Sequence, residues 1–341
     1  MKKKKYKRKN KGLKWIIYIV VILLTFIIVF EYRTIAYDEE QRLNEIKEEQ
    51  ERKEKEERER KYNTCMNTPY KDDSIDTMFE ELLETTNSAI YFKDINNNYT
   101  LTSRENASFY GASLIKLYLT SYLIENARAG EIDLNTTITY TYNYSLYHGR
   151  LLSTRTVGEE ITLSDLIYYS ISVSDNGAYM MLSDYVGVTP LRNYANNLFG
   201  TNLTISEGDR FSYLTVSDTN KLLEYVYDLI QVDDEYSSLL INAMNNTYFN
   251  SLNFDDKTFL HKYGYYNLNY NDIGIYNSDN PYLISIFTLY GPDEEYMFDQ
   301  TRKISKSIYE IYQTNLDLKE EYCTSLAYPE ENKTMKIDTE L

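Results

Sequence analysis

The sequence predicts an α+β domain, in which an antiparallel sheet is flanked by the first and last helices and interrupted by an all-helical subdomain. Two observations support this fold class. Segments typical of strands occur in two groups, one around position 90 and one after position 258, with a helix-rich stretch between them. Amphipathic helices precede the first group and follow the second. Helices placed in this way would bury the apolar face of the sheet.

Each element follows from a local pattern. Helices are expected at residues 74–83, 113–127, 164–171, 189–200, 217–230 and 294–312, and strands at residues 89–92, 100–102, 258–261, 273–276 and 282–289. Thr162 and Asp165 suit a capping box at the start of the third helix. Pro190 opens the fourth helix and Gly200 ends it. Ser217 is expected to cap the fifth helix.

The N-terminal segment predicts a membrane anchor that precedes the domain. Residues 1–14 hold nine Lys/Arg and no acid, and form a basic tail. Residues 15–32 are apolar and approach the ~30 Å needed to span the hydrocarbon core as a transmembrane helix. The positive-inside rule keeps the basic tail in the cytoplasm, so we expect a single-pass protein of the cell membrane with an extracytoplasmic domain. A cleaved signal peptide is the alternative, although residues 34–36 make a poor cleavage site.

Residues 33–64 are expected to form a charged helical stalk. Nearly all residues from Asp38 to Lys61 are Glu, Lys, Arg or Gln, and acids and bases recur three or four apart, a spacing that supports an isolated helix. Leu43 and Ile46 are the only aliphatic residues there, so no heptad seam is sustained. We therefore expect a solvated stalk on a monomer, with a weak coiled-coil dimer as the alternative.

The folded domain is expected at residues 65–341, and its charge limits its partners. The formal net charge of the whole chain is −16 despite the nine cations of the basic tail, so the rest is strongly acidic. Such a body argues against binding to nucleic acid, since phosphate contacts need clustered Lys/Arg. The basic tail itself precedes an apolar segment, which favours membrane topology over a nucleic-acid arm.

Cysteine and histidine are scarce, and this limits the chemistry. Cys65 and Cys323 lie near the two ends of the domain, and outside the membrane they can oxidise to one disulfide. Two unpaired buried thiols are the alternative. His148 and His261 are the only histidines, so a Ser-His-Asp triad or a His-based metal site has little to build on. No metal or other cofactor is expected.

Ser113 and Lys116 form a candidate catalytic pair. Their spacing at the start of a helix puts both side chains on one face, one turn apart. A serine hydroxyl needs a nearby base to act as a nucleophile, and a lysine whose pKa is lowered by burial can serve. The helix N-terminus adds free N–H groups for a developing oxyanion. Alone, this spacing is weak evidence, because a capping serine followed by an exposed lysine is common.

Two further motifs follow in the order that one family requires. Ser-Asp-Asn at residues 174–176 lies between predicted helices, and Lys-Tyr-Gly at residues 262–264 lies at the end of a predicted strand. A second Ser-Asp-Asn at residues 278–280 falls between two strands and is predicted to be a hairpin turn. Together, the motifs resemble S-x-x-K, S-D-N and K-T-G of class A β-lactamases and penicillin-binding proteins. The resemblance extends over residues 74–315 and implies a β-lactamase/transpeptidase-like fold.

The resemblance implies catalytic roles for four residues. Ser113 would be the acylated nucleophile, and Lys116 would be the general base or its proton relay. Ser174 would carry protons to the leaving nitrogen. Asn176 would hydrogen-bond both the substrate amide and Lys116.

The third motif would bind substrate. By the same resemblance, Lys262 would attract the substrate carboxylate, and the backbone N–H groups of Ser113 and Tyr265 would form the oxyanion hole. Gly264 completes the motif. Tyr263 departs from the family, which has a small Thr or Ser hydroxyl there to contact the carboxylate. A phenol is larger, so the usual pose of a β-lactam is in doubt, unless Tyr263 packs away from the cleft.

A second departure concerns deacylation. Class A β-lactamases carry a Glu that activates the deacylating water, in a pattern with an Asn after it. Glu207 lies near the corresponding place, but no Asn follows at that spacing. Glu207 is therefore a weak candidate for this base, and an exposed turn residue is the alternative. Without such a base, acylation can proceed while hydrolysis is slow.

The two histidines are expected to lie near the motifs. Tyr147, His148 and Gly149 would line the rim of the cleft, where stacking on substrate competes with plain surface exposure. His261 precedes Lys262 and would point to the opposite face of the strand, which favours packing over catalysis.

Two functions are compatible with this sequence. The first is a serine hydrolase or acyltransferase acting on D-alanyl peptides of the cell wall, β-lactams or related amides. The second is a catalytically impaired surface domain that binds cell-wall peptide or a protein partner. The retained motif residues favour an enzyme, since a scaffold has no physical need for them.

Overall fold

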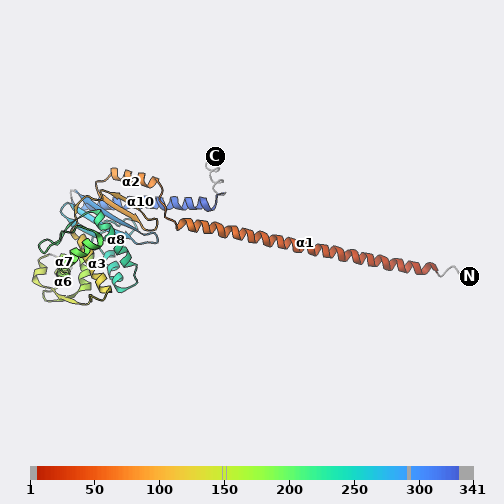
Figure 1. Ribbon diagram of the computed structural model, residues 1–341, viewed down its shortest axis with the longest axis horizontal. Helices are drawn as coiled ribbons and strands as arrows, with labels where there is room; N and C mark the ends of the chain where they lie inside the picture. Colours follow the sequence, from red (N-terminus) through yellow and green to blue (C-terminus); the bar gives the residue numbers. More distant parts are fainter. Residues whose placement is uncertain (1–5, 148, 151, 290–292, 330–341) are drawn as a thin grey trace. The chain divides into compact units, whose positions relative to one another are not determined.

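The structure is a computed structural model that describes residues 6–147, 149–150, 152–289 and 293–329. The chain divides into two compact units, shown with their elements in Figure 1. One unit contains the segments up to Met66 and from Cys323 onward, and the other contains Asn67–Tyr322. The motifs that carry the candidate chemistry all lie in the second unit.

A five-stranded sheet forms the centre of the second unit. Its strand order is β2-β1-β9-β8-β7, and every neighbouring pair is antiparallel. The strands are β1 (Ala89–Asp94), β2 (Tyr99–Ser103), β7 (Leu260–Tyr266), β8 (Asn269–Tyr276) and β9 (Tyr282–Leu289). Pairing of β1 with β9 joins the two groups of strands, for example through Phe92 opposite Ile284. The predicted antiparallel sheet is therefore confirmed, and β7 is one of its edges.

One face of the sheet is covered by the first and last helices of the fold. These are α2 (Ser74–Glu84) and α10 (Glu294–Ala327), which Figure 1 shows together over the sheet. Ile75 and Phe79 of α2 and Ile304 of α10 are buried in one cluster with inward-facing strand residues. Burial of each such side chain stabilises the fold by about 1.5–3 kcal/mol.

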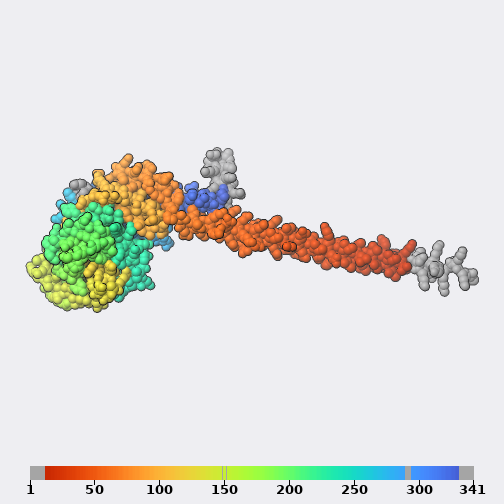
Figure 2. Space-filling model, viewed as in Figure 1, coloured from red at the N-terminus to blue at the C-terminus, as the bar shows by residue number. Residues whose placement is uncertain are grey.

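The other face of the sheet carries the helical subdomain. In Figure 2 its surface, yellow to teal, forms the lower part of the unit. The main helices are α3 (Ile115–Arg128), α5 (Leu163–Ser172), α6 (Asn176–Val186), α7 (Val188–Phe199), α8 (Val216–Ile230) and α9 (Glu235–Asn245). The shorter elements are β3 (Phe109–Tyr110), η1 (Ala112–Leu114), β4 (Thr137–Thr139), α4 (Tyr142–Ser145), η2 (Leu152–Thr154), β5 (Glu160–Thr162) and β6 (Tyr213–Leu214). Helix α3 is the central one, since Leu117, Tyr118 and Leu123 are completely buried.

The predicted cap of α8 is wrong by two residues. Thr215, not Ser217, is the N-cap, because its hydroxyl accepts from the Asp218 N–H at 3.1 Å. The Asp218 carboxylate accepts in return from the Thr215 N–H at 2.8 Å, which completes a capping box. Only Thr215 has an acid three residues later, whereas Ser217 has Asn220 there. At α5, Thr162 accepts from the Asp165 N–H at 3.1 Å, which is one of the two hydrogen bonds of the expected capping box.

Three boundaries differ more, and one is the start of β8, which lies at Asn269 and not at residue 273. The strand expected at residues 258–261 begins at Leu260 and continues to Tyr266, so the lysine motif lies inside a strand. Tyrosines on both sides of Gly264 favour the extended chain, and β7 pairs with β8 along its whole length. Helix α10 continues past the expected end at residue 312 to Ala327. Helices α6 and α9 were not predicted.

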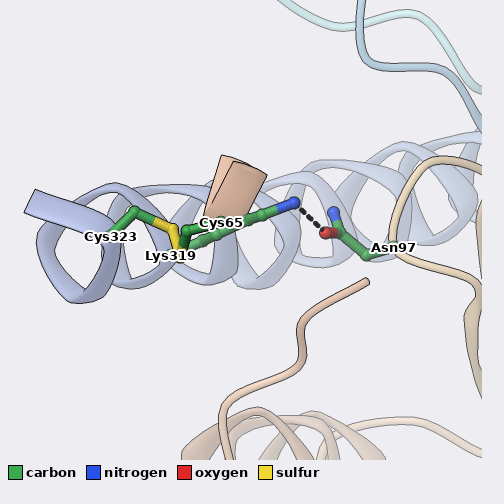
Figure 3. The surroundings of a disulfide bond; sticks show 4 residues. All are labelled: Cys65, Asn97, Lys319 and Cys323. Atoms are coloured by element: carbon green, nitrogen blue, oxygen red, sulfur yellow. Dashed lines mark hydrogen bonds between the residues drawn. A yellow bond between two sulfur atoms is a disulfide. The ribbon is translucent and has the colours of Figure 1, made fainter. Parts of the chain in front are cut away.

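A buried polar group attaches α10 to the turn between β1 and β2. Nζ of Lys319 donates to Oδ1 of Asn97 at 2.7 Å, as Figure 3 shows, and Nδ2 of Asn97 donates to Oδ2 of Asp94 at 2.8 Å. Burial lowers the pKa of Lys319, and the nearby carboxylate of Asp94 opposes this shift. Each buried polar group thus has a partner, which is the usual condition for burying it at all.

The other unit contains the long helix α1 (Tyr6–Met66) and the end of α10. Among the described residues, α1 is the one helix long and apolar enough to cross a membrane, as an anchor or a signal sequence would be. Its polar part carries ion pairs four residues apart, such as Lys53 with Glu49 at 2.6 Å. Cys65 of α1 is bonded to Cys323 of α10, with their Cα atoms 5.5 Å apart (Figure 3).

Candidate active site

Lys116 lies at the centre of the candidate site. It is the second residue of α3 and is completely buried. Its Nζ lies 2.7 Å from the carbonyl oxygen of Ser174, 2.8 Å from Oδ1 of Asn176 and 3.2 Å from the Ser174 hydroxyl. A neutral amine can donate to the two carbonyl oxygens and accept a hydrogen bond from the hydroxyl. The arrangement therefore accommodates an ammonium that donates to all three oxygens, and also an uncharged lysine that accepts from the hydroxyl.

The electrostatics of Lys116 favour its uncharged state. Burial lowers its pKa well below the ordinary value for lysine, and the positive charge of Lys262 lowers it further. The carboxylate of Asp175 opposes the shift. No water can solvate an ammonium at a fully buried position, so the proton is lost more readily. Lys116 is thus a more available proton acceptor than a solvated lysine would be.

Lys262 shares the Ser174 hydroxyl with Lys116. It is a buried residue of the edge strand β7, and its Nζ donates to Oγ of Ser174 at 3.0 Å and to the carbonyl oxygen of Tyr263 at 2.7 Å. Burial lowers the pKa of Lys262 to about 7, while the nearby Asp272 opposes that shift. The Ser174 hydroxyl can accept from a charged Lys262 and donate to a neutral Lys116, which links the two amines by one proton path.

A tight turn between α5 and α6 aims Ser174 and Asn176 at the lysines. Ser174 adopts a left-handed backbone, with φ of 55°. Asp175 then caps α6, because its Oδ1 accepts from the Ala178 N–H at 2.9 Å. This capping explains why the short acid lies between the two polar residues. Its second oxygen accepts from the Leu152 N–H at 2.9 Å and so attaches a neighbouring loop.

Ser113 lies in η1, directly before α3. The preceding Ala112 has a positive φ of 46°, a conformation that a residue with a Cβ rarely adopts. The turn is held by Asn271, whose Nδ2 donates to the carbonyl oxygen of Tyr110 at 2.9 Å. Ser113 is half-buried, and its hydroxyl has no hydrogen-bond partner among the described residues. Backbone strain of this kind is concentrated at functional sites.

The backbone of β7 passes next to the Ser113 N–H. A Cβ added to Gly264 would lie 3.2 Å from the Ser113 nitrogen and would overlap with the carbonyl oxygen of Gly111. Glycine is therefore required at this position of the third motif. This close approach places the segment of Gly264 and Tyr265 beside the Ser113 N–H, the pair of backbone groups expected for an oxyanion hole.

Tyr263 is turned into an aromatic cluster. Its side chain is only 3% exposed, and its ring centroid lies 4.8 Å from that of Phe249. Tyr265, Tyr270, Met297 and Phe298 also belong to the cluster. Burial raises the pKa of Tyr263 to about 12, so the phenol stays neutral. Its side chain therefore packs between this cluster and Nζ of Lys262, which lies 4.2 Å from the ring centroid.

Glu207 has a different partner from the motif residues. Its side chain is 77% exposed and pairs with Arg210 at 2.8 Å. Within the described part of the chain, no hydrogen bond or ion pair links Glu207 to Ser113 or Lys116. The structure does not bring Glu207 together with the other candidate residues.

His261 precedes Lys262 in β7 and is buried, as expected. Its Nδ1 lies 2.9 Å from Oδ1 of Asp272, and its Nε2 contacts the Thr247 hydroxyl. His261 and Asp272 are at most 1% exposed. His148 lies outside the described residues, whereas Tyr147 is exposed and Gly149 is buried against Asp175.

The comparison with known proteins agrees with this geometry. The sequence profile of the beta-lactamase enzyme family matches residues 73–312. The chain belongs to the beta-lactamase enzyme family. The family resemblance and the fold expected from it are confirmed, and the three motifs of this β-lactamase-like serine hydrolase fold meet at one place. Among curated proteins, none matches this chain.

Solved structures show the same fold at low sequence identity. A β-lactamase from Chitinophaga pinensis is 17% identical, with a TM-score of 0.62 over 70% of this chain and 100% of that one. PBP-A is 16% identical, with a TM-score of 0.63 over 71% and 97% of the two chains. A class A β-lactamase from Bacteroides cellulosilyticus is 19% identical, with a TM-score of 0.62 over 71% and 98%. At these identities the likeness concerns the fold.

Sequence reasoning missed three polar residues around the site. Asp175 belongs to a recognised motif but received no role. Asp272 faces His261 and influences the pKa of Lys262. Arg150 lowers the pKa of both buried lysines through its positive charge. An isolated arginine in a polar loop carries no spacing pattern, so no sequence feature pointed to it.

Proposed function

We propose that this protein is a serine acyl-transfer enzyme that forms an acyl-enzyme at Ser113 with D-alanyl peptides, β-lactams or related amides. One observation carries the proposal: Lys116, a buried amine of lowered pKa, lies one turn from Ser113 and bonds to Ser174 and Asn176. A scaffold that only binds would gain nothing from burying two lysines around one serine, because burial of amines is unfavourable.

The proposed acylation step returns Lys116 and Ser174 to their starting protonation states. Oγ of Ser113 attacks the amide carbonyl carbon, and its proton passes to Nζ of Lys116. The Ser113 and Tyr265 N–H groups stabilise the oxyanion that forms. The carbon–nitrogen bond then breaks, and the leaving nitrogen takes a proton from the Ser174 hydroxyl. That hydroxyl regains its proton from the protonated Lys116, which restores the neutral base and leaves an ester at Ser113.

Deacylation is proposed to be slow. Water must attack the Ser113 ester, and this step needs its own general base. Glu207 is exposed and paired with Arg210, which supports a protein that holds its acyl group rather than one that destroys β-lactams rapidly. This outcome is consistent with a penicillin-binding or peptide-processing role.

A second function, a catalytically impaired domain that binds cell-wall peptide or a protein partner, is favoured by one specific observation. The small hydroxyl expected in the third motif is replaced by Tyr263, whose ring is buried in the aromatic cluster. Binding of peptide to the two lysines could persist without turnover. The two functions differ in whether Ser113 becomes covalently modified.

We further propose that the protein is a single-pass membrane protein with a cytoplasmic N-terminus and an extracytoplasmic domain. The apolar part of α1 and the basic residues before it support this topology. A substrate in the cell wall would then be on the same side of the membrane as Ser113.

The deciding experiment is intact-mass measurement of the full chain, in detergent, after incubation with a fluorescent penicillin. We expect a stable adduct of one penicillin on the wild type and none on Ser113→Ala. Ser174→Ala should slow adduct formation at least tenfold, whereas Ser278→Ala, in the second Ser-Asp-Asn, should leave it unchanged.

The other outcomes are equally informative. Rapid hydrolysis without an accumulating adduct would indicate that the protein is an efficient β-lactamase. Absence of any adduct, together with absence of D-alanyl peptide cleavage, would contradict the enzymatic proposal and favour the binding domain.

A further inference from the structure

Arg150 is an exposed cation held against two aromatic rings. Its guanidinium carbon lies 3.9 Å from the ring centroid of Tyr248 and 5.0 Å from that of Phe249. Among the described residues, no carboxylate pairs with it and no hydrogen bond uses its side chain. Unlike Arg104 and Arg192, which donate to backbone carbonyl oxygens, Arg150 is held by ring contacts alone within the described part of the chain.

The rings connect Arg150 to the candidate site. The ring of Phe249 packs on that of Tyr263, and Nζ of Lys262 lies 4.2 Å from the Tyr263 ring centroid. Burial is the main cause of the lowered pKa of Lys262 and of Lys116. The positive charge of Arg150 is close enough to lower both pKa values further. Arg150 is therefore part of the electrostatic surroundings of both lysines.

The loop that carries Arg150 is fixed on both sides by Asp175. Gly149 packs so closely on the Asp175 carboxylate that any side chain at position 149 would overlap with it. On the other side, the Leu152 N–H donates to Oδ2 of Asp175 at 2.9 Å. Because Asp175 also caps the helix that begins at Asn176, the positions of Arg150 and of Asn176 depend on the same carboxylate.

The surroundings of Arg150 suit a carboxylate ligand. Stacking on a ring leaves the N–H edge of a guanidinium free, and that edge matches the two oxygens of a carboxylate. The rings also restrict the side chain before binding, so less conformational entropy is lost. On the strand side, Tyr263 offers no small hydroxyl, since its ring is packed in the aromatic cluster.

We propose that Arg150 is a second anion-binding residue of this site, beside Lys262, and receives the free carboxylate of the substrate from the helical subdomain. The inference rests on the proposed function and narrows its substrate class to amides with a nearby free carboxylate. It assigns recognition to a loop residue outside the three motifs, in place of the hydroxyl that Tyr263 does not supply.

The test measures binding and not turnover. In the full chain with Ser113→Ala, we expect an N-acylated D-alanyl-D-alanine to bind more tightly than its C-terminal amide, by NMR titration. Adding Arg150→Ala should weaken binding of the acid by 10- to 100-fold and leave the amide unchanged. Arg150→Lys keeps the charge but not the planar edge, and should recover only part of the loss.

Arg155→Ala provides the matched control. Arg155 also lies over a tyrosine, at 5.6 Å from the Tyr169 ring, but it has Glu159 beside it at 3.8 Å. Its replacement should change binding of the acid less than twofold. Circular dichroism of each variant verifies that the fold is retained, which is expected because both arginines are exposed.

The outcomes separate this inference from the proposed function. Equal effects of Arg150→Ala on acid and amide, or no binding of either ligand, would overturn the inference even if wild-type protein is acylated by penicillin. The converse result is a wild type that forms no acyl-enzyme, together with a preference for the acid that is lost in Arg150→Ala. That result would overturn the proposed enzymatic function and support Arg150 as an anion-binding residue.

Discussion

At the scale of single residues, two buried lysines have opposite requirements around one hydroxyl. Lys116 must be neutral to accept the proton of Ser113, so acylation is lost as the pH falls through its pKa, which burial lowers. Lys262 must be charged to attract an anion, so its contribution is lost as the pH rises through about 7. Burial thus favours the neutral form that Lys116 needs as a base, and limits the pH range in which Lys262 is charged.

The expected pH profile of acylation is bell-shaped. The second-order rate constant for acylation by penicillin, measured from pH 5 to pH 9, should decrease above about pH 7. In Lys262→Arg, whose guanidinium keeps its charge, the alkaline decrease should disappear although the maximum rate is lower. The same alkaline decrease in Lys262→Arg would show that another group titrates there. Lys257→Arg, at a half-buried position beside Asp256 and outside the three motifs, is the control.

The sequence predicted the identity of the residues that meet here better than their contacts. Ser113, Lys116, Ser174 and Lys262 were expected from spacing and order, because each motif is local. The orientation of Tyr263 could not be predicted, since its ring packs on Phe249 and Met297, which come from other parts of the chain.

At the scale of elements, the close approach of β7 to η1 decides the geometry of the site. Gly264→Ala would push a methyl group into the carbonyl of Gly111 and toward the Ser113 nitrogen, both of which are backbone atoms. Because neither can yield as a flexible side chain would, strand and turn must separate. We expect about 1–3 kcal/mol of destabilisation in urea unfolding and at least a 100-fold slower acylation.

Gly208→Ala is the matched control for this change. Nothing lies within 4 Å of a Cβ added at Gly208, and no positive φ is required there. Its stability and acylation rate should therefore stay within experimental error of the wild type. If Gly264→Ala acylated at the wild-type rate, the backbone groups beside Ser113 would not form the oxyanion hole.

Elements were predicted most reliably where a pattern is local and repeated. The β1, β9 and α2 predictions rested on apolar periodicity, and the structure has them almost at the expected bounds. The N-terminus of α8 was misplaced because Thr215 and Ser217 are both good caps. The hydrogen bond from the Thr215 N–H to the Asp218 carboxylate decides between them. Helix α6 was missed because its first turn is also the second motif.

At the scale of the whole chain, the disulfide reports the compartment in which the domain folds. Disulfides persist outside the cytoplasm, where thiols are not kept reduced. Cys65 and Cys323 are bonded to each other, so the structure fits the proposed extracytoplasmic location. The domain limits at residues 14, 32 and 64 stay predictions, since α1 runs through all three without a break.

Alkylation of denatured protein from intact cells tests this location. In the full chain, Cys65 and Cys323 should react with a maleimide reagent only after reduction, because the proposed export places both thiols in an oxidising compartment. A variant without residues 1–37 should stay in the reducing cytoplasm and label at both thiols without reductant. Cys65→Ser leaves one thiol that cannot pair within the chain, and it should label in either case. Two reactive thiols in the unreduced full chain would place the domain in the cytoplasm, where a cell-wall substrate cannot reach Ser113.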